Sequence, residues 1–191
     1  MVATPSRCLF IGMPPAASCR QLTAELVRHG VDTRLGANLF PPSNWHQSLS
    51  ARFEDEPRVV DRLRAAGDTL SARAVKLRLD RIESRPGPEG IHWAFRADHT
   101  PADFRTLVRG LGAAITAQTG MKPIKPTPHI TISYWAGERL PRMLTIEPVD
   151  WLLDEVLLVR GGGRPYHYAV IARWPPQPPR EQPVAEQQSL F

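Results

Sequence analysis

Two short segments of the sequence share one pattern: a histidine, any residue, a hydroxyl residue and an aliphatic residue. They are His46-Gln47-Ser48-Leu49 and His129-Ile130-Thr131-Ile132. In an extended strand, residues two apart point to the same face, so each segment places an imidazole beside a hydroxyl. An imidazole can move a proton near neutral pH, and a hydroxyl can donate a hydrogen bond to a phosphate oxygen. Two such pairs facing each other would supply an acid, a base and a phosphate cradle, enough to cleave a phosphodiester without a metal.

The surroundings of the two motifs are also alike. Each motif follows a loop that contains prolines, over residues 40–43 and 122–128, and lies in a short stretch of strand-like residues. The alternative interpretation is two unrelated strand histidines that are satisfied by neighbouring hydrogen bonds. The histidines at positions 92, 99 and 167 lack the pattern, and we assign them no role.

The composition limits the class of protein and partner. The 191 residues suit one domain or two small lobes with a shared core, with 42% hydrophobic and 23% charged residues. The net charge of +5 favours an anionic partner such as RNA or a nucleotide, although a solvated basic surface is the alternative. Cys8 and Cys19 are the only cysteines and form no Cys-x-x-Cys pair. We therefore expect a cytoplasmic monomer with no disulfide, metal, cofactor or membrane contact.

Hydrophobic periodicity predicts alternating helices and strands around the two motifs. Helices are expected over 16–29, 56–72 and 101–119, the last of them capped by Thr100. Strands are expected over 7–12, 45–50, 74–82, 91–96, 129–134, 145–149, 155–159 and 166–174. A helix–strand pattern followed by a motif strand thus occurs in each half, which is typical of a duplicated, bilobal α+β domain.

Several segments together resemble a known family. They are the opening Arg7-Cys8-Leu9-Phe10-Ile11-Gly12, the block Thr127-Pro128-His129-Ile130-Thr131-Ile132, and a closing strand with Tyr168 and Trp174. With the two motifs about eighty residues apart, they resemble the 2H phosphoesterase superfamily, and within it the bacterial RNA 2′,3′-cyclic phosphodiesterases, or 2′-5′ RNA ligase family. The resemblance spans residues 7 to 175. It implies a bilobal, duplicated α+β fold with two mainly antiparallel sheets, flanked by helices around a central cleft, and a domain over 1–175 with two pseudo-symmetric lobes.

The resemblance also implies roles for individual residues. His46 would be the proton donor and His129 the proton acceptor, while Ser48 and Thr131 would bind the substrate phosphate. Lys125 and Tyr134 are possible further substrate contacts. For Lys125 the alternative is a place on a solvated loop. Tyr134 or Trp45 could stack on a base, and the alternative for both is a place in the core. The chain departs from the family pattern in two places: Ser48 stands where threonine is more common, and Tyr134-Trp135 follow the second motif where many members have arginine.

The function implied is metal-independent hydrolysis of 2′,3′-cyclic phosphate ends of RNA or nucleotides to 2′-phosphates. The alternatives are 2′-5′ RNA ligation, which is the reverse direction of similar chemistry, and a non-catalytic adaptor that binds RNA or is tethered to a sliding clamp.

The C-terminal segment differs from the rest in composition. Residues 176–191 are rich in proline, so we expect a disordered tail. Its end resembles the short peptide by which bacterial proteins dock on the sliding clamp, although the second position has glutamine in place of leucine. An incidental polar tail is the alternative. The segment is Gln187-Gln188-Ser189-Leu190-Phe191.

Overall fold

Two antiparallel sheets form the framework of the computed structural model, which describes residues 6–88 and 90–178. The first sheet has the strand order β2-β1-β8-β9, and β3 also pairs with β1. These strands span Arg7–Gly12 (β1), Gln47–Ser48 (β2), Phe53–Glu54 (β3), Val156–Gly162 (β8) and His167–Trp174 (β9). The first motif therefore lies at one end of this sheet, where β2 pairs with the end of β1.

The second sheet has four strands in the order β6-β5-β4-β7. They span Val75–Pro86 (β4), Ile91–Ala97 (β5), His129–Ala136 (β6) and Leu144–Leu153 (β7). The second motif opens the edge strand β6. A register shift between Leu79 and Arg81 interrupts the pairing of β4 with both neighbours. Such a bulge changes which residues of a strand face the core.

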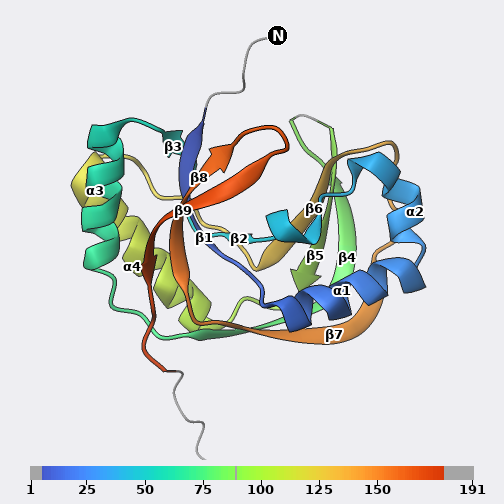
Figure 1. The fold of residues 1–191 in the computed structure, drawn as a ribbon. Coiled ribbons are helices and arrows are strands. Elements are labelled where there is room, and N and C mark those ends of the chain that lie inside the picture. The colour runs from blue at the N-terminus through green and yellow to red at the C-terminus, as the bar shows by residue number, and fades with distance from the viewer. Residues whose placement is uncertain (1–5, 89, 179–191) are drawn as a thin grey trace, which may run out of the picture.

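Helices lie on either side of the two sheets (Figure 1). The helices α3 (Pro57–Asp68) and α4 (Ala102–Thr119) pack against each other on the side of the first sheet, and α3 also contacts β8 and β9. The helix α1 (Ala16–Arg28) contacts β7 of the second sheet and the short helix α2 (Val31–Leu35). The predicted bilobal α+β fold with two antiparallel sheets is confirmed.

One cluster of buried hydrophobic side chains runs through both sheets. It includes Phe10 of β1, Trp45 just before β2, and Phe95 of β5. The rings of Trp45 and Phe95 meet edge to face, with centres 5.6 Å apart. Trp45 is thus fully buried between the sheets, so the possibility that it stacks on a base is wrong. The two lobes are held together because large aromatic side chains from each are removed from water in a shared core.

Some elements differ from the sequence-based expectation. The strand expected over 45–50 is only two residues long, Gln47–Ser48, and the 3-10 turn Pro42–Asn44 lies just before it. The helix expected to reach residue 72 ends at Asp68, where the Thr69 hydroxyl donates to the Ala66 carbonyl. The helix α4 begins after Pro101 without a side-chain cap, so the predicted cap at Thr100 is wrong.

The start of the proline-rich segment is placed beside the second sheet. Gln177 forms an isolated parallel bridge with Arg73, and its carbonyl accepts a 2.7 Å hydrogen bond from the Ala74 amide. Residues 179–191, including the segment that resembles a clamp-binding peptide, lie outside the described residues. The disorder and the clamp contact of the tail therefore stay predictions.

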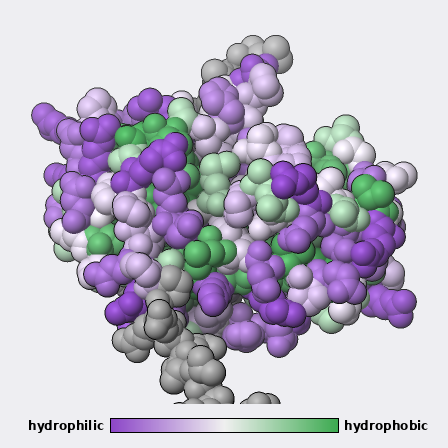
Figure 2. Space-filling model, turned by 60° about the horizontal axis from the view of Figure 1, so that its bottom comes forward, coloured by the Kyte–Doolittle hydropathy of each residue, from purple (hydrophilic) through white to green (hydrophobic). Residues whose placement is uncertain are grey.

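The surface offers no large apolar face in the view of Figure 2, where hydrophobic residues lie in separate small patches between hydrophilic ones. None of the helices in the described ranges combines the length and the apolar composition needed to cross a bilayer.

Candidate active site

The first motif histidine is fixed by the turn that precedes it. His46 Nδ1 lies 2.8 Å from the carbonyl oxygen of Asn44. The Asn44 side chain in turn donates a 3.0 Å hydrogen bond to the carbonyl of Tyr166, which ties the turn to the hairpin between β8 and β9. The His46 ring also meets the Tyr168 ring edge to face, with centres 4.9 Å apart. The imidazole is therefore held both by its own turn and by a hairpin more than a hundred positions away in sequence.

The second motif histidine is fixed in the same way. His129 Nδ1 lies 2.7 Å from the carbonyl oxygen of Thr127, two residues before it. Because a carbonyl oxygen can only accept, Nδ1 of each histidine carries the proton in this contact. The neutral rings of His46 and His129 therefore both present Nε2 as the basic nitrogen, and the protonated rings present Nε2–H as the acid. Identical anchoring thus leaves either histidine able to take or give a proton through Nε2.

Gln47, the residue between His46 and Ser48, connects the two motifs. It points away from the motif face and is fully buried. Its Oε1 accepts a 2.6 Å hydrogen bond from the amide of His129. Its Nε2 donates to the carbonyls of Ser48 at 2.8 Å and Thr127 at 3.2 Å. A single side chain thus sets the position of one motif relative to the other, across 82 positions of sequence.

An aromatic cavity of about 410 Å³ opens on the side of His46. Besides Asn44 and Arg52, its lining consists of His46, Thr131 and five aromatic residues: Phe40, Tyr134, Trp135, Tyr166 and Tyr168. The rings of Phe40 and Tyr134 meet edge to face, as do those of Tyr166 and Tyr168. Such walls can hold a planar base by stacking and apolar contact.

A basic cavity of about 280 Å³ opens on the side of His129. Its lining includes His129, Thr131, Thr127 and Ala94, together with Glu83, Arg85, His92, Arg96 and Lys125. Thr131 lines both cavities. The two cavities therefore adjoin at Thr131 of the second motif, and each of them contains one of the two motif histidines.

The surroundings lower the pKa of both motif histidines. Burial lowers the pKa of His46 to about 4, and the positive charge of Arg52 acts in the same direction, as does that of His129 when this ring is protonated. Burial also lowers the pKa of His129, and the nearby cations Arg96 and Arg85 add to this effect. The contact of each ring with its carbonyl acts in the opposite direction. Both rings are therefore neutral near pH 7, and a bound phosphate anion would raise both pKa values.

The structure places the residues singled out in the sequence unequally. His46 and His129 line the adjoining cavities, Thr131 lines both, Tyr134 lies in the aromatic cavity and Lys125 in the basic cavity. Ser48 is half-buried and paired with Ile11 of β1, and it is not among the residues that line either cavity.

Sequence reasoning missed most of the remaining lining. Arg52, Tyr166, Arg85 and Arg96 carry no motif, and His92 was set aside because it lacks the pattern. A weak signal exists for Arg85 and Arg96. Each comes two positions after another residue of the lining on its strand, Glu83 and Ala94 respectively, and residues two apart on a strand point to the same face. No local signal exists for Arg52 and Tyr166, which are brought to the cavity from loops.

No family model matches the chain, and no curated protein matches it. Solved structures do match. Escherichia coli LigT complexed with 3′-AMP has a TM-score of 0.74 at 18% identity, over 91% of this chain and 99% of that chain. A structure described as a phosphoesterase has a TM-score of 0.72 at 18% identity, over 91% and 99%. TT0787 of Thermus thermophilus has a TM-score of 0.66 at 19% identity, over 91% and 100%. The chain therefore has the fold of LigT and of a phosphoesterase, which confirms the resemblance to 2H phosphoesterases at the level of the fold.

Proposed function

We propose that this protein is a metal-independent phosphodiesterase that hydrolyses 2′,3′-cyclic phosphate ends of RNA or nucleotides to 2′-phosphates. The observation that carries the proposal is the matched pair of imidazoles. His46 and His129 are anchored through Nδ1 in the same way, are joined by Gln47, and line cavities that adjoin at Thr131. This arrangement supplies an acid, a base and a hydrogen-bond donor for the phosphate.

The reaction would proceed by one displacement at phosphorus. His129 Nε2 accepts a proton from a water molecule as the water oxygen forms a bond to phosphorus. The bond between phosphorus and the 3′ oxygen breaks, and the departing oxygen takes the Nε2 proton of His46. The Thr131 hydroxyl donates to a non-bridging phosphate oxygen, where negative charge builds up. The product is a 2′-phosphate with a free 3′-hydroxyl, and one proton has been moved from His46 to the product and another from water to His129.

The aromatic cavity supports a nucleotide as the substrate. Its five rings adjoin His46 and Thr131, so a base bound there would place its ribose next to the proposed reacting groups. The LigT structures of the same fold include complexes with 3′-AMP, ATP and NADP+. These ligands have in common an adenosine with at least one phosphate.

The deciding experiment is an assay of the purified protein with adenosine 2′,3′-cyclic phosphate and with an oligonucleotide that ends in a 2′,3′-cyclic phosphate. Products are identified by 31P NMR or chromatography, with and without EDTA. We expect a 2′-phosphate product and no effect of EDTA. His46→Ala and His129→Ala should abolish most turnover, while His99→Ala, an exposed histidine outside both cavities, serves as the matched control.

Other products would replace the proposal. A joined oligonucleotide in the presence of a 5′-hydroxyl acceptor would identify 2′-5′ ligation as the activity. Binding of the oligonucleotide without turnover would favour a non-catalytic adaptor. Activity lost on adding EDTA and restored by a divalent metal would contradict the metal-independent mechanism.

A further inference from the structure

The proposed reaction increases the negative charge on the phosphate. A 2′,3′-cyclic phosphate carries one negative charge, whereas a 2′-phosphate carries about 1.5 to 2 near pH 7. The added charge collects on the non-bridging oxygens in the transition state. Of the two hydroxyl residues in the motifs, Thr131 lines the cavities and Ser48 does not. A hydroxyl donates a hydrogen bond but carries no charge, so the developing anion calls for a cation beside Thr131.

Arg52 is the one permanent cation in the described lining of the aromatic cavity, where it lies with His46 and Thr131. Burial is the largest cause of the lowered pKa of His46, and the charge of Arg52 acts in the same direction. The Arg52 guanidinium is therefore within electrostatic reach of the imidazole that gives its proton to the departing 3′ oxygen.

The backbone around Arg52 is fixed to the first sheet. Arg52 follows β2 and immediately precedes β3, and both of these short strands pair with β1. Between them, the Ser50 hydroxyl accepts a 2.9 Å hydrogen bond from the Phe10 amide of β1. Phe53, the next residue after Arg52, is buried in the shared core. The loop is thus held on both sides of Arg52, while the Arg52 side chain is exposed.

The fold does not use the charge of Arg52. The two nearest carboxylates along the chain are engaged by other arginines, because Glu54 pairs with Arg7 at 3.0 Å and Asp55 pairs with Arg160 at 2.5 Å. Over residues 6–88 and 90–178, no carboxylate forms an ion pair with Arg52. A guanidinium without a counter-charge, beside two proposed reacting groups, is available to an anionic ligand.

The other cations near the motifs lie in the basic cavity. They are Arg85, Arg96 and Lys125, which line this cavity together with His129. In the proposed reaction, this is the side of the attacking water. Arg52 is therefore the cation on the side of His46, where the 3′ oxygen departs.

We propose that Arg52 is a further catalytic residue, whose guanidinium donates charge-assisted hydrogen bonds to a non-bridging oxygen of the reacting phosphate in the transition state. The inference rests on the proposed function. Arg52 keeps its protons throughout, and the bonds that form and break are those of the displacement described above. Thr131 and Arg52 together hold the non-bridging oxygens, and Arg52 supplies the positive charge that the threonine hydroxyl lacks.

The first test is the kinetics of Arg52→Gln with adenosine 2′,3′-cyclic phosphate. We expect kcat to fall about 10²-fold with KM nearly unchanged, because the contact is stronger in the transition state than with the substrate monoanion. Arg52→Lys keeps the charge and should lose less activity than Arg52→Gln. Guanidinium chloride, below the concentrations that unfold the protein, should restore part of the kcat of Arg52→Ala and none of that of His46→Ala.

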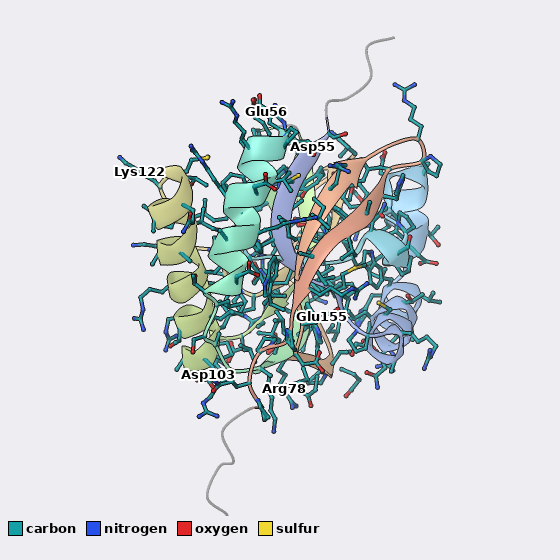
Figure 3. All side chains as sticks on the ribbon, turned by 60° about the vertical axis from the view of Figure 1, so that its left-hand side comes forward. Asp55, Glu56, Arg78, Asp103, Lys122 and Glu155 are labelled. Atoms are coloured by element: carbon teal, nitrogen blue, oxygen red, sulfur yellow. The ribbon has the colours of Figure 1, made fainter. Side chains whose placement is uncertain are left out.

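The matched control is Arg78→Gln, the same change at another exposed arginine. Arg78 pairs with Asp150, is absent from both cavities and lies at the lower end of the molecule in Figure 3. Its variant should keep the kcat of the unmodified protein. An equal kcat in Arg52→Gln and Arg78→Gln would overturn the proposal. A raised KM with unchanged kcat in Arg52→Gln would also overturn it, since Arg52 would then bind the base or the substrate monoanion.

A binding measurement tests Arg52 without turnover. Calorimetry compares adenosine with its cyclic 2′,3′ ester of vanadate, which is five-coordinate as phosphorus is in the transition state. Arg52→Gln should weaken binding of the vanadate ester about 10²-fold and leave that of adenosine unchanged, and Arg78→Gln should alter neither. Equal affinities of Arg52→Gln and Arg78→Gln for the ester would overturn the role of Arg52. Absence of hydrolysis by the unmodified protein would instead refute the proposed function, and the two failures are thereby distinguished.

Discussion

Replacement of Gln47 by methionine should remove the hydrogen bonds that join the two motifs, while the volume of the side chain stays almost unchanged. Gln47 is fully buried and makes three hydrogen bonds, to the His129 amide and to the carbonyls of Ser48 and Thr127. Methionine can fill the same space but offers no equivalent donor or acceptor. The perturbation is therefore the loss of polar contacts rather than the creation of a cavity.

The hydrogen bonds determine the size of the effect. The Thr127 carbonyl keeps a partner, because it also accepts from His129 Nδ1. The His129 amide loses the acceptor at 2.6 Å, and leaving a buried donor unsatisfied costs about 1–3 kcal/mol. Loss of the bond to the Ser48 carbonyl adds about 1 kcal/mol. We therefore expect the free energy of unfolding to fall by about 2–4 kcal/mol.

Urea denaturation followed by circular dichroism measures this change, with Gln118→Met, at an exposed position of α4, as the control. The midpoint should fall by about 1–2 M for Gln47→Met and hardly at all for the control. In the folded variant, kcat should fall at least tenfold, because the His129 backbone is no longer held against the first motif. A midpoint and a kcat equal to those of Gln118→Met would refute the idea that Gln47 connects the two motifs.

Three further results are expected. His46→Ala and His129→Ala should each lower kcat by about 10²- to 10⁴-fold, with the fold retained by circular dichroism; variants with full activity would refute the acid–base roles. The pH profile of kcat/KM should have its maximum below pH 6.5. The active form needs a protonated His46, whose pKa is about 4, and a neutral His129, whose pKa is also lowered by burial. At pH values above both pKa values, activity therefore falls as His46 loses its proton. A maximum above pH 7.5 would contradict this reasoning. Trp135→Ala, at the half-exposed rim of the aromatic cavity, should raise KM about tenfold with little change in kcat, and an unchanged KM would remove Trp135 from base binding.

The local pattern of the sequence predicts the reacting side chains but only part of the cavity around them. Alternation along a strand depends on backbone geometry over two residues, so the spacing of His129 and Thr131 was sufficient to place them on one face. The same reasoning gave the buried face of β4 at Val75, Leu77 and Leu79. It did not give the bulge after Leu79, which returns Glu83 and Arg85 to the cavity face.

The sequence alone thus determined the two His-x-hydroxyl motifs, the alternation of helices and strands, and the bilobal α+β class, because these depend on contacts between near neighbours. Tertiary structure alone decided that Gln47 bonds to the His129 amide, that Tyr166 and Phe40 line one cavity, and that Arg96 lies beside His129. These are contacts between residues far apart in sequence. Their register is fixed by the packing of the shared core, in which Trp45 is buried against Phe95 of the second sheet.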